Sequence, residues 1–102
     1  MIKTTDYFGN EIILSQQRWV HIIQEHPEIA GYLDEIKFTL KGPDLVKRSK
    51  RDEDVHLYYR FFKEVLRGKY ILVVVKISVP NFIITCYITH RIKEGEIICK
   101  KK

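Results

Sequence analysis

The most apolar part of the chain, residues 82–91, alternates between side chains of two kinds. Successive side chains of a β-strand point to opposite faces, so a period of two predicts a strand here. The first face is typical of a core, whereas the second places three hydroxyls and a guanidinium in one row, which makes that row a candidate binding surface. The first face would carry Phe82, Ile84, Cys86, Ile88 and His90, and the second Ile83, Thr85, Tyr87, Thr89 and Arg91.

The first part of the chain predicts a hairpin followed by two helices. Residues 2–14 favour two short strands around a turn at 8–10, and Ser15 is a favourable N-cap for a helix. Pro27 is expected to end that helix at or just before His26 and to begin a second helix, which Gly42 ends. Apolar residues recur with helical spacing at 19, 22 and 23, with His26 at the next position of the same stripe, and again at 29, 33, 36 and 40.

From residue 44 onward the pattern changes to short apolar and aromatic runs, separated by Gly, Pro and Asn. These links are too short for the crossovers that parallel strands need, so we expect an antiparallel meander. The expected fold is a single α+β domain of residues 1–102. An N-terminal β-hairpin and two helices would pack on one face of a four- to five-stranded antiparallel sheet, leaving the other face free. The expected strands are 45–49, 55–66, 70–78, 82–91 and 96–100.

The composition, with 45% hydrophobic and 30% charged residues, is that of an ordinary globular protein. No apolar run approaches the roughly 20 residues that span a bilayer, and the N-terminus lacks a signal sequence, so we expect a cytoplasmic protein without membrane contact. The net charge of +5 favours polyanionic partners. Basic residues concentrate at 47–51 and at 100–102, although both runs are also compatible with an ordinary solvated surface.

Polar side chains also alternate on the neighbouring predicted strands. His56, Tyr58 and Arg60 would share one face of the strand that begins at residue 55, and Lys76 interrupts an aliphatic run. A lysine there is costly to bury unless it is paired, so an edge, a cleft or a ligand is expected beside it. Cations and hydroxyls on adjacent strands suit a phosphodiester, because cations neutralise charge on phosphorus and hydroxyls hold its oxygens. A one-residue change of register would turn each row to the opposite face, so a functionally neutral sheet face is the alternative.

The histidines do not form a metal site. His21 and His26 are about 140° apart on a helix, and His21 shares its face with Glu25 as an exposed polar residue. His26 lies at a helix corner, where its imidazole can point at the edge of the sheet. Two cysteines are too few for a disulfide framework or a zinc pattern, and we expect no metal or cofactor.

Several short motifs together resemble a known arrangement: Arg-Trp-Val-His-Ile and Glu-His-Pro-Glu within 18–28, and the strand segments 43–46, 57–60, 72–76 and 84–89. The chain is similar to the small nucleases of the barnase–EndoU–colicin–RelE superfold. The best match is to phage- and bacteria-associated branches with a His-Pro-Glu corner and a Thr-x-Tyr strand. The likeness covers most of residues 10–98 and implies a helix-plus-antiparallel-sheet fold with metal-independent RNA cleavage.

The resemblance also implies roles for individual residues. His26 becomes a candidate acid or base, Arg60 and Lys76 become candidate phosphate-stabilising cations, and Thr85, Tyr87 and Thr89 would line the site. We expect Tyr87 to act in catalysis either as the acid–base partner of His26 or as an orienting group. The expected substrate-binding residues are Tyr58, Thr85, Thr89 and Arg91.

The leading hypothesis is therefore a toxin-like, metal-independent endoribonuclease that acts as a monomer or homodimer, with RNA as substrate and an antitoxin or immunity protein as partner. One alternative is a catalytically inactive RNA- or protein-binding module that stacks its ligand on Tyr58, Tyr59 and Tyr87. Another is a structural domain whose last strand pairs with a second copy.

Overall fold

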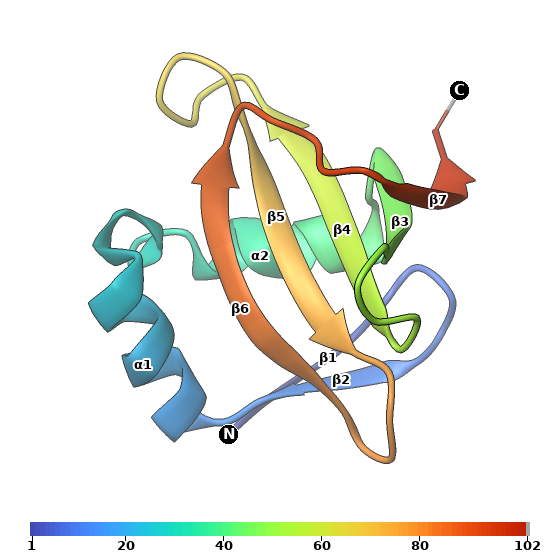
Figure 1. Cartoon of the computed structure of the whole chain (residues 1–102). Coiled ribbons are helices and arrows are strands. Elements are labelled where there is room, and N and C mark those ends of the chain that lie inside the picture. The colour runs from blue at the N-terminus through green and yellow to red at the C-terminus, as the bar shows by residue number, and fades with distance from the viewer. Residues whose placement is uncertain (102) are drawn as a thin grey trace.

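The computed structural model describes residues 1–101 as an α+β fold, with two α-helices and a seven-stranded mixed sheet in that part of the chain (Figure 1). Across the sheet the strands follow the order β1-β2-β6-β5-β4-β3-β7. Along the chain the elements are β1 (Ile2–Thr5), β2 (Glu11–Leu14), α1 (Gln16–Glu25), the 3₁₀-helix η1 (Pro27–Ile29), α2 (Leu33–Lys41), β3 (Leu45–Ser49), β4 (Val55–Phe62), β5 (Lys69–Lys76), β6 (Asn81–Thr89) and β7 (Gly95–Lys100).

The helix boundaries follow the predicted capping signals in part. The Ser15 hydroxyl accepts the Arg18 backbone N–H at 3.1 Å, and α1 ends before Pro27, as predicted. The second helix, however, does not begin at the proline. Pro27 begins a single 3₁₀ turn, and α2 starts only at Leu33. Gly31 lies between them, and glycine is among the poorest helix formers, so the chain turns there before the helix continues.

The sheet is larger than predicted and is not purely antiparallel. Strands β3, β4, β5 and β6 form the expected meander, and β7 pairs antiparallel with β3. The N-terminal hairpin joins the same sheet, because β2 pairs in parallel with the start of β6. The Asn81 side-chain amide also donates to the Glu11 carbonyl at 3.2 Å. Glu11 and Asn81 are 70 positions apart in the sequence, so no local pattern could have revealed the contact between β2 and β6.

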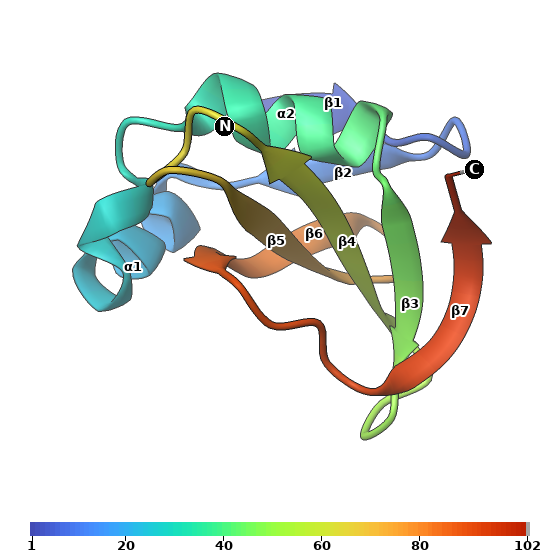
Figure 2. The same ribbon diagram turned by 90° about the horizontal axis from the view of Figure 1, so that it is seen from above.

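α2 packs against one side of the sheet, which we call the helix face, and α1 lies beside β6 at the margin of the sheet (Figures 1 and 2). The main core lies there and combines α2 residues such as Ile36 and Leu40 with Val73 and Val75 of β5. The opposite side, which we call the outer face, carries a smaller buried cluster of Val55, Leu57, Tyr59 and Leu72.

The outer face is not fully open, which corrects the sequence-based expectation. The segment of residues 90–94 runs from β6 to β7 across this face, on the side away from α2 (Figure 2). The Tyr59 hydroxyl accepts the Lys93 backbone N–H at 2.9 Å, and Tyr59 is completely buried. Burial raises the pKa of the Tyr59 phenol, and this hydrogen bond opposes the rise. The segment therefore divides the outer face into two exposed parts.

A β-bulge changes the predicted alternation in β6. The register between β5 and β6 shifts between Val74 and Val75, so that Thr85 lies opposite Val74 while Ile83 lies opposite Val75. Ile84 is the extra residue. Ile83 is consequently buried in the main core, whereas Ile84 packs on the outer face, the reverse of the prediction. Beyond the bulge, Thr85 and Tyr87 lie on the outer face as expected.

Candidate functional site: a cation-lined hollow on the outer face

A hollow of about 540 Å³ lies on the outer face. Its floor comes from the three central strands, and its rim comes from the segment that follows β3 and from the segment that precedes β7. The lining thus combines an apolar floor with a mostly basic rim. The floor residues are Val55, Leu57, Val74, Thr85 and Tyr87, and the rim residues are Ser49, Lys50, Arg51, Lys93 and Glu94.

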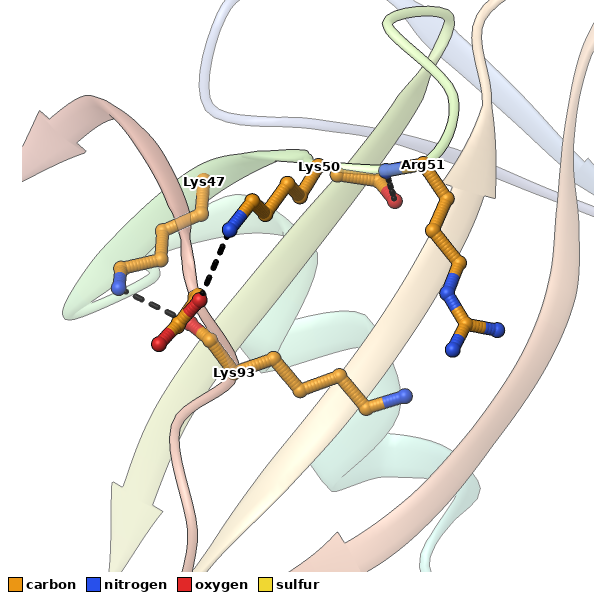
Figure 3. Close-up of polar contacts among 6 residues, drawn as sticks. Lys47, Lys50, Arg51 and Lys93 are labelled. Atoms are coloured by element: carbon orange, nitrogen blue, oxygen red, sulfur yellow. Dashed lines mark hydrogen bonds and ion pairs between the residues drawn. The ribbon is translucent and has the colours of Figure 1, made fainter.

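Three cationic side chains line this hollow, namely Lys50, Arg51 and Lys93. A fourth, Lys47, lies beside its rim (Figure 3). The Lys47 Nζ donates to the Lys93 carbonyl at 2.9 Å, which ties the rim together. Arg51 and Lys93 extend from opposite sides over the same part of the sheet (Figure 3). The concentration of positive charge over a concave surface favours an anionic ligand.

One carboxylate accompanies these cations. The Lys50 Nζ lies 3.2 Å from Glu94 Oε2, and the two side chains are 73% and 84% exposed. Exposed pairs of this kind contribute only about 0–1 kcal/mol, so a phosphate could displace Glu94 at little cost. The hollow is therefore available to a polyanion despite this ion pair.

A histidine and a tyrosine meet at the β6 side of the hollow. The rings of His26 and Tyr87 are stacked, with centroids 4.8 Å apart and planes inclined by 25°. The His26 Nδ1 lies 3.8 Å from Glu28 Oε2, and the His26 side chain is 33% exposed. Lys93 approaches the same tyrosine, with its Nζ 5.9 Å from the ring centroid. These side chains bring a titratable imidazole next to a phenol and an ammonium group.

The folding of the α1–η1 corner explains how His26 reaches this position. Pro27 ends α1, so the backbone of His26 is no longer helical, and the side chain need not follow the apolar face of α1. β2 pairs with β6 only near its start, at Asn81 and Phe82, and η1 packs against β6 further along. The corner therefore sits beside Tyr87, at the edge of the outer face.

Thr85 contributes an unusual hydroxyl to the floor. Its Oγ1 is enclosed, and it has no hydrogen-bond partner among residues 1–101. Enclosed polar groups normally have partners, and leaving one unpaired typically costs about 1–3 kcal/mol. Thr85 is part of the hollow's lining, but this enclosed hydroxyl does not open into the hollow.

Arg60 and Tyr58, which the sequence placed in the same site, lie on the helix face instead. The Arg60 Nη1 donates to the Gly42 carbonyl at 3.1 Å, at the C-terminal end of α2, and the guanidinium lies 5.4 Å from the Phe62 ring centroid. Tyr58 is buried, and its hydroxyl donates to Asp6. Burial, followed by this bond to Asp6, strongly raises the pKa of the Tyr58 phenol. Both residues therefore hold the fold together rather than facing the hollow.

Lys76 shares the outer face but lies far from Tyr87. The partner of Tyr87 on β5 is Leu72, and Lys76 is four residues further along, or roughly 13 Å. The Lys76 Nζ donates to Asp52 Oδ2 at 2.9 Å. This hydrogen bond lowers the pKa of the Asp52 carboxyl and raises that of the Lys76 ammonium. The lysine thus has a carboxylate partner, which offsets the free-energy cost of placing its charged ammonium in an aliphatic strand.

Thr89 and Arg91 form the turn that follows β6. The Thr89 Oγ1 accepts the Arg91 backbone N–H at 3.1 Å. Neither residue is part of the hollow's lining. Of the eight site residues expected from the sequence, the structure brings together His26, Tyr87 and Thr85.

The cations of the hollow were not among the predicted site residues. The basic run 47–51 was visible in the sequence, but the acidic residues that follow it made a neutral surface an equally good interpretation. Lys93 lies in an irregular segment, so no strand or helix period could assign its side chain to a face. Only the path of residues 90–94 over the sheet brings it to the hollow.

Residues 1–101 show neither a metal-binding cluster nor a membrane-spanning helix. They contain no group of three or more histidine, cysteine or acidic side chains that could hold a metal ion. In the same part of the chain, no helix has the length and apolar character needed to cross a bilayer.

Comparison of the chain with family models, with curated proteins and with solved structures gave no match.

Proposed function

We propose that the protein is a metal-independent endoribonuclease that binds RNA across the outer face and cleaves it beside His26. The observation that carries this proposal is the His26–Tyr87 stack at the margin of a hollow lined by three cationic side chains, with a fourth, Lys47, beside its rim. RNA supplies the polyanionic backbone that these cations fit, and its 2′-hydroxyl is the nucleophile for cleavage without a metal.

In the proposed reaction, His26 acts as the general base. Its imidazole takes the proton of a 2′-hydroxyl, and the 2′-oxygen attacks the adjacent phosphorus. The Glu28 carboxylate, 3.8 Å from the His26 Nδ1, stabilises the resulting imidazolium. The Tyr87 hydroxyl then protonates the departing 5′-oxygen, which leaves a 2′,3′-cyclic phosphate on one product and a 5′-hydroxyl on the other.

The remaining groups of the hollow act on the phosphate. Lys93 and Arg51 extend over the floor and stabilise the charge that develops on the pentacovalent phosphorus. Thr85 lies in the floor beneath them, with its hydroxyl enclosed. Arg60 has no part in this chemistry, because it faces the other side of the sheet.

The test is incubation of the protein with a short single-stranded RNA in excess chelator, followed by analysis of the product ends. We expect 2′,3′-cyclic phosphate ends, and no cleavage where the scissile nucleotide is 2′-deoxy. His26→Ala should lower the rate about 10²–10⁴-fold, the usual contribution of positioned acid–base catalysis. His21→Ala is the matched control, because His21 pairs with Glu25 on the exposed side of α1 and should retain wild-type activity.

A second candidate function is RNA binding without cleavage. The observation that favours it is that neither of the two expected catalytic cations lines the hollow: Arg60 donates to the Gly42 carbonyl, and Lys76 donates to Asp52. Salt-dependent RNA binding that survives His26→Ala, in a protein that cleaves no RNA, would support this function and exclude the nuclease.

A further inference from the structure

A second exposed part of the outer face lies beyond the 90–94 segment and is aromatic. Phe61 and Tyr70 are cross-strand partners on β4 and β5, and their rings meet edge to face with centroids 5.6 Å apart. Tyr59 packs in the same way against Tyr70, at 6.1 Å. Phe61 is 48% exposed and Tyr70 is partly exposed, whereas Tyr59 is buried beneath them. Aromatic rings therefore face solvent where β4 ends and β5 begins.

The position of the Phe61 ring is fixed by its surroundings. Its edge lies against Tyr70, and its far end lies over Gly68 in the β4–β5 turn, where an added Cβ would come within 2.8 Å of the Phe61 Cζ. The Phe61 backbone N–H is also held by Asp44 Oδ2 at 2.8 Å. A ring that is fixed but half exposed adds little to the core and is pre-organised for a flat ligand.

This aromatic surface continues the cation-lined hollow. Phe61 lies four residues along β4 from Leu57 on the hollow floor, which is roughly 13 Å. Tyr70 lies two residues from Leu72, the strand partner of Tyr87. The segment that carries Lys93 lies between the two parts of the face, where its backbone N–H is bound by the Tyr59 hydroxyl.

We propose that Phe61 and Tyr70 form a stacking subsite for an unpaired base of an RNA whose neighbouring phosphates bind in the hollow. This inference rests on the proposed function and specifies its substrate as single-stranded. Cations bind phosphates in any nucleic acid, whereas an aromatic ring can stack only on a base that is free of its duplex neighbours. A double-stranded RNA would present phosphates to the hollow but no base face to Phe61.

The experiment is an abasic scan, read by fluorescence anisotropy at fixed salt. Each position of a short RNA is made abasic in turn, and the scissile nucleotide is 2′-deoxy so that binding is measured without cleavage. In the wild-type protein, removal of one particular base should weaken binding about 5- to 150-fold. Phe61→Ala should cause a similar loss with the intact RNA, and removal of the same base should then cost nothing further.

Two variants separate stacking from folding. Phe61→Leu keeps an apolar side chain without an aromatic face and should lose as much affinity as Phe61→Ala, whereas Phe61→Trp should retain it. Phe38→Ala is the matched control, since Phe38 is a 53% exposed phenylalanine on α2, across the sheet. Its affinity should equal that of the wild type.

The outcomes distinguish this subsite from the proposed function. Salt-dependent binding with a flat abasic scan, or equal affinity for the duplex, would overturn the subsite and leave the nuclease intact. A position-specific abasic effect that Phe61→Ala removes would establish the subsite even if no RNA were cleaved.

Discussion

The salt dependence of RNA binding provides a quantitative test of the hollow. We consider the double variant Arg51→Ala/Lys93→Ala, which removes the two cations that extend over the floor. For single strands, the logarithm of the binding constant falls with the logarithm of salt concentration by about 0.7 per phosphate contact. Four cations, Lys47, Lys50, Arg51 and Lys93, therefore predict a slope of about −2.8, and the double variant should retain a slope of about −1.4.

These slopes predict measurable changes in affinity. Between about 50 and 200 mM salt, the wild-type affinity should fall about 50-fold and that of the double variant only about 7-fold. The assay is fluorescence anisotropy with an RNA that is 2′-deoxy at the scissile position. Lys37→Ala is the control, because it removes a lysine from α2 on the helix face and should leave the slope unchanged.

Two results would refute this reasoning. A double variant with the wild-type slope would mean that phosphates do not bind in the hollow. A Lys37→Ala variant that lost half as much slope as the double variant would mean that the net charge of +5, and not the hollow, attracts RNA.

Three further predictions concern the same structure. Glu94→Gln should strengthen RNA binding, because it removes the carboxylate that pairs with Lys50; anisotropy measures this. Tyr58→Phe should lower the free energy of unfolding in urea by about 1.5–3 kcal/mol, because the buried Asp6 carboxylate loses a hydrogen bond. Asp52→Asn should lower the melting temperature at pH 7. The Lys76 hydrogen bond holds the pKa of Asp52 below 3.8, so the Asp52–Lys76 pair stabilises the fold above pH 3.8 and is lost as the pH falls through that lowered pKa. The difference in melting temperature between Asp52→Asn and the wild type should therefore shrink in acid.

The first two of these predictions have matched controls. Glu96→Gln removes a carboxylate that pairs with Arg48 outside the hollow, so unchanged affinity is expected; an equal gain would point to net charge alone. Tyr59→Phe loses a hydroxyl that accepts a neutral backbone N–H and should cost less, about 0.5–1.5 kcal/mol. If the melting temperatures of Asp52→Asn and the wild type differed equally at every pH, the Asp52–Lys76 ion pair would not be the cause.

Local patterns in the sequence predicted the helices and the meander because both depend on near neighbours. Ser15 and Pro27 act within a few residues of themselves, and the strands β3 to β6 follow one another along the chain. The parallel contact between β2 and β6 and the bulge at Ile84 depend on distant partners and on hydrogen-bond register, which alternation cannot show.

The same distinction explains the outcome for the candidate site. His26 was assigned to a helix corner by Pro27, and the corner does bring it to Tyr87. The alternation along β4 correctly placed Arg60 on one face of the sheet, but that face is the one that α2 covers and not the outer face. Lys93 was missed because its position depends on the path of an irregular segment and on a hydrogen bond to Tyr59.

The most direct test of the central claim is to map RNA binding on the protein by NMR, using a single-stranded RNA that is 2′-deoxy at the scissile position. If RNA binds in the hollow, amide shift changes will concentrate on the outer face, at Leu57, Thr85 and Tyr87, and in the 90–94 segment. Changes that concentrate instead around Gly42 and Arg60 on the helix face, with Thr85 and Tyr87 unmoved, would contradict it.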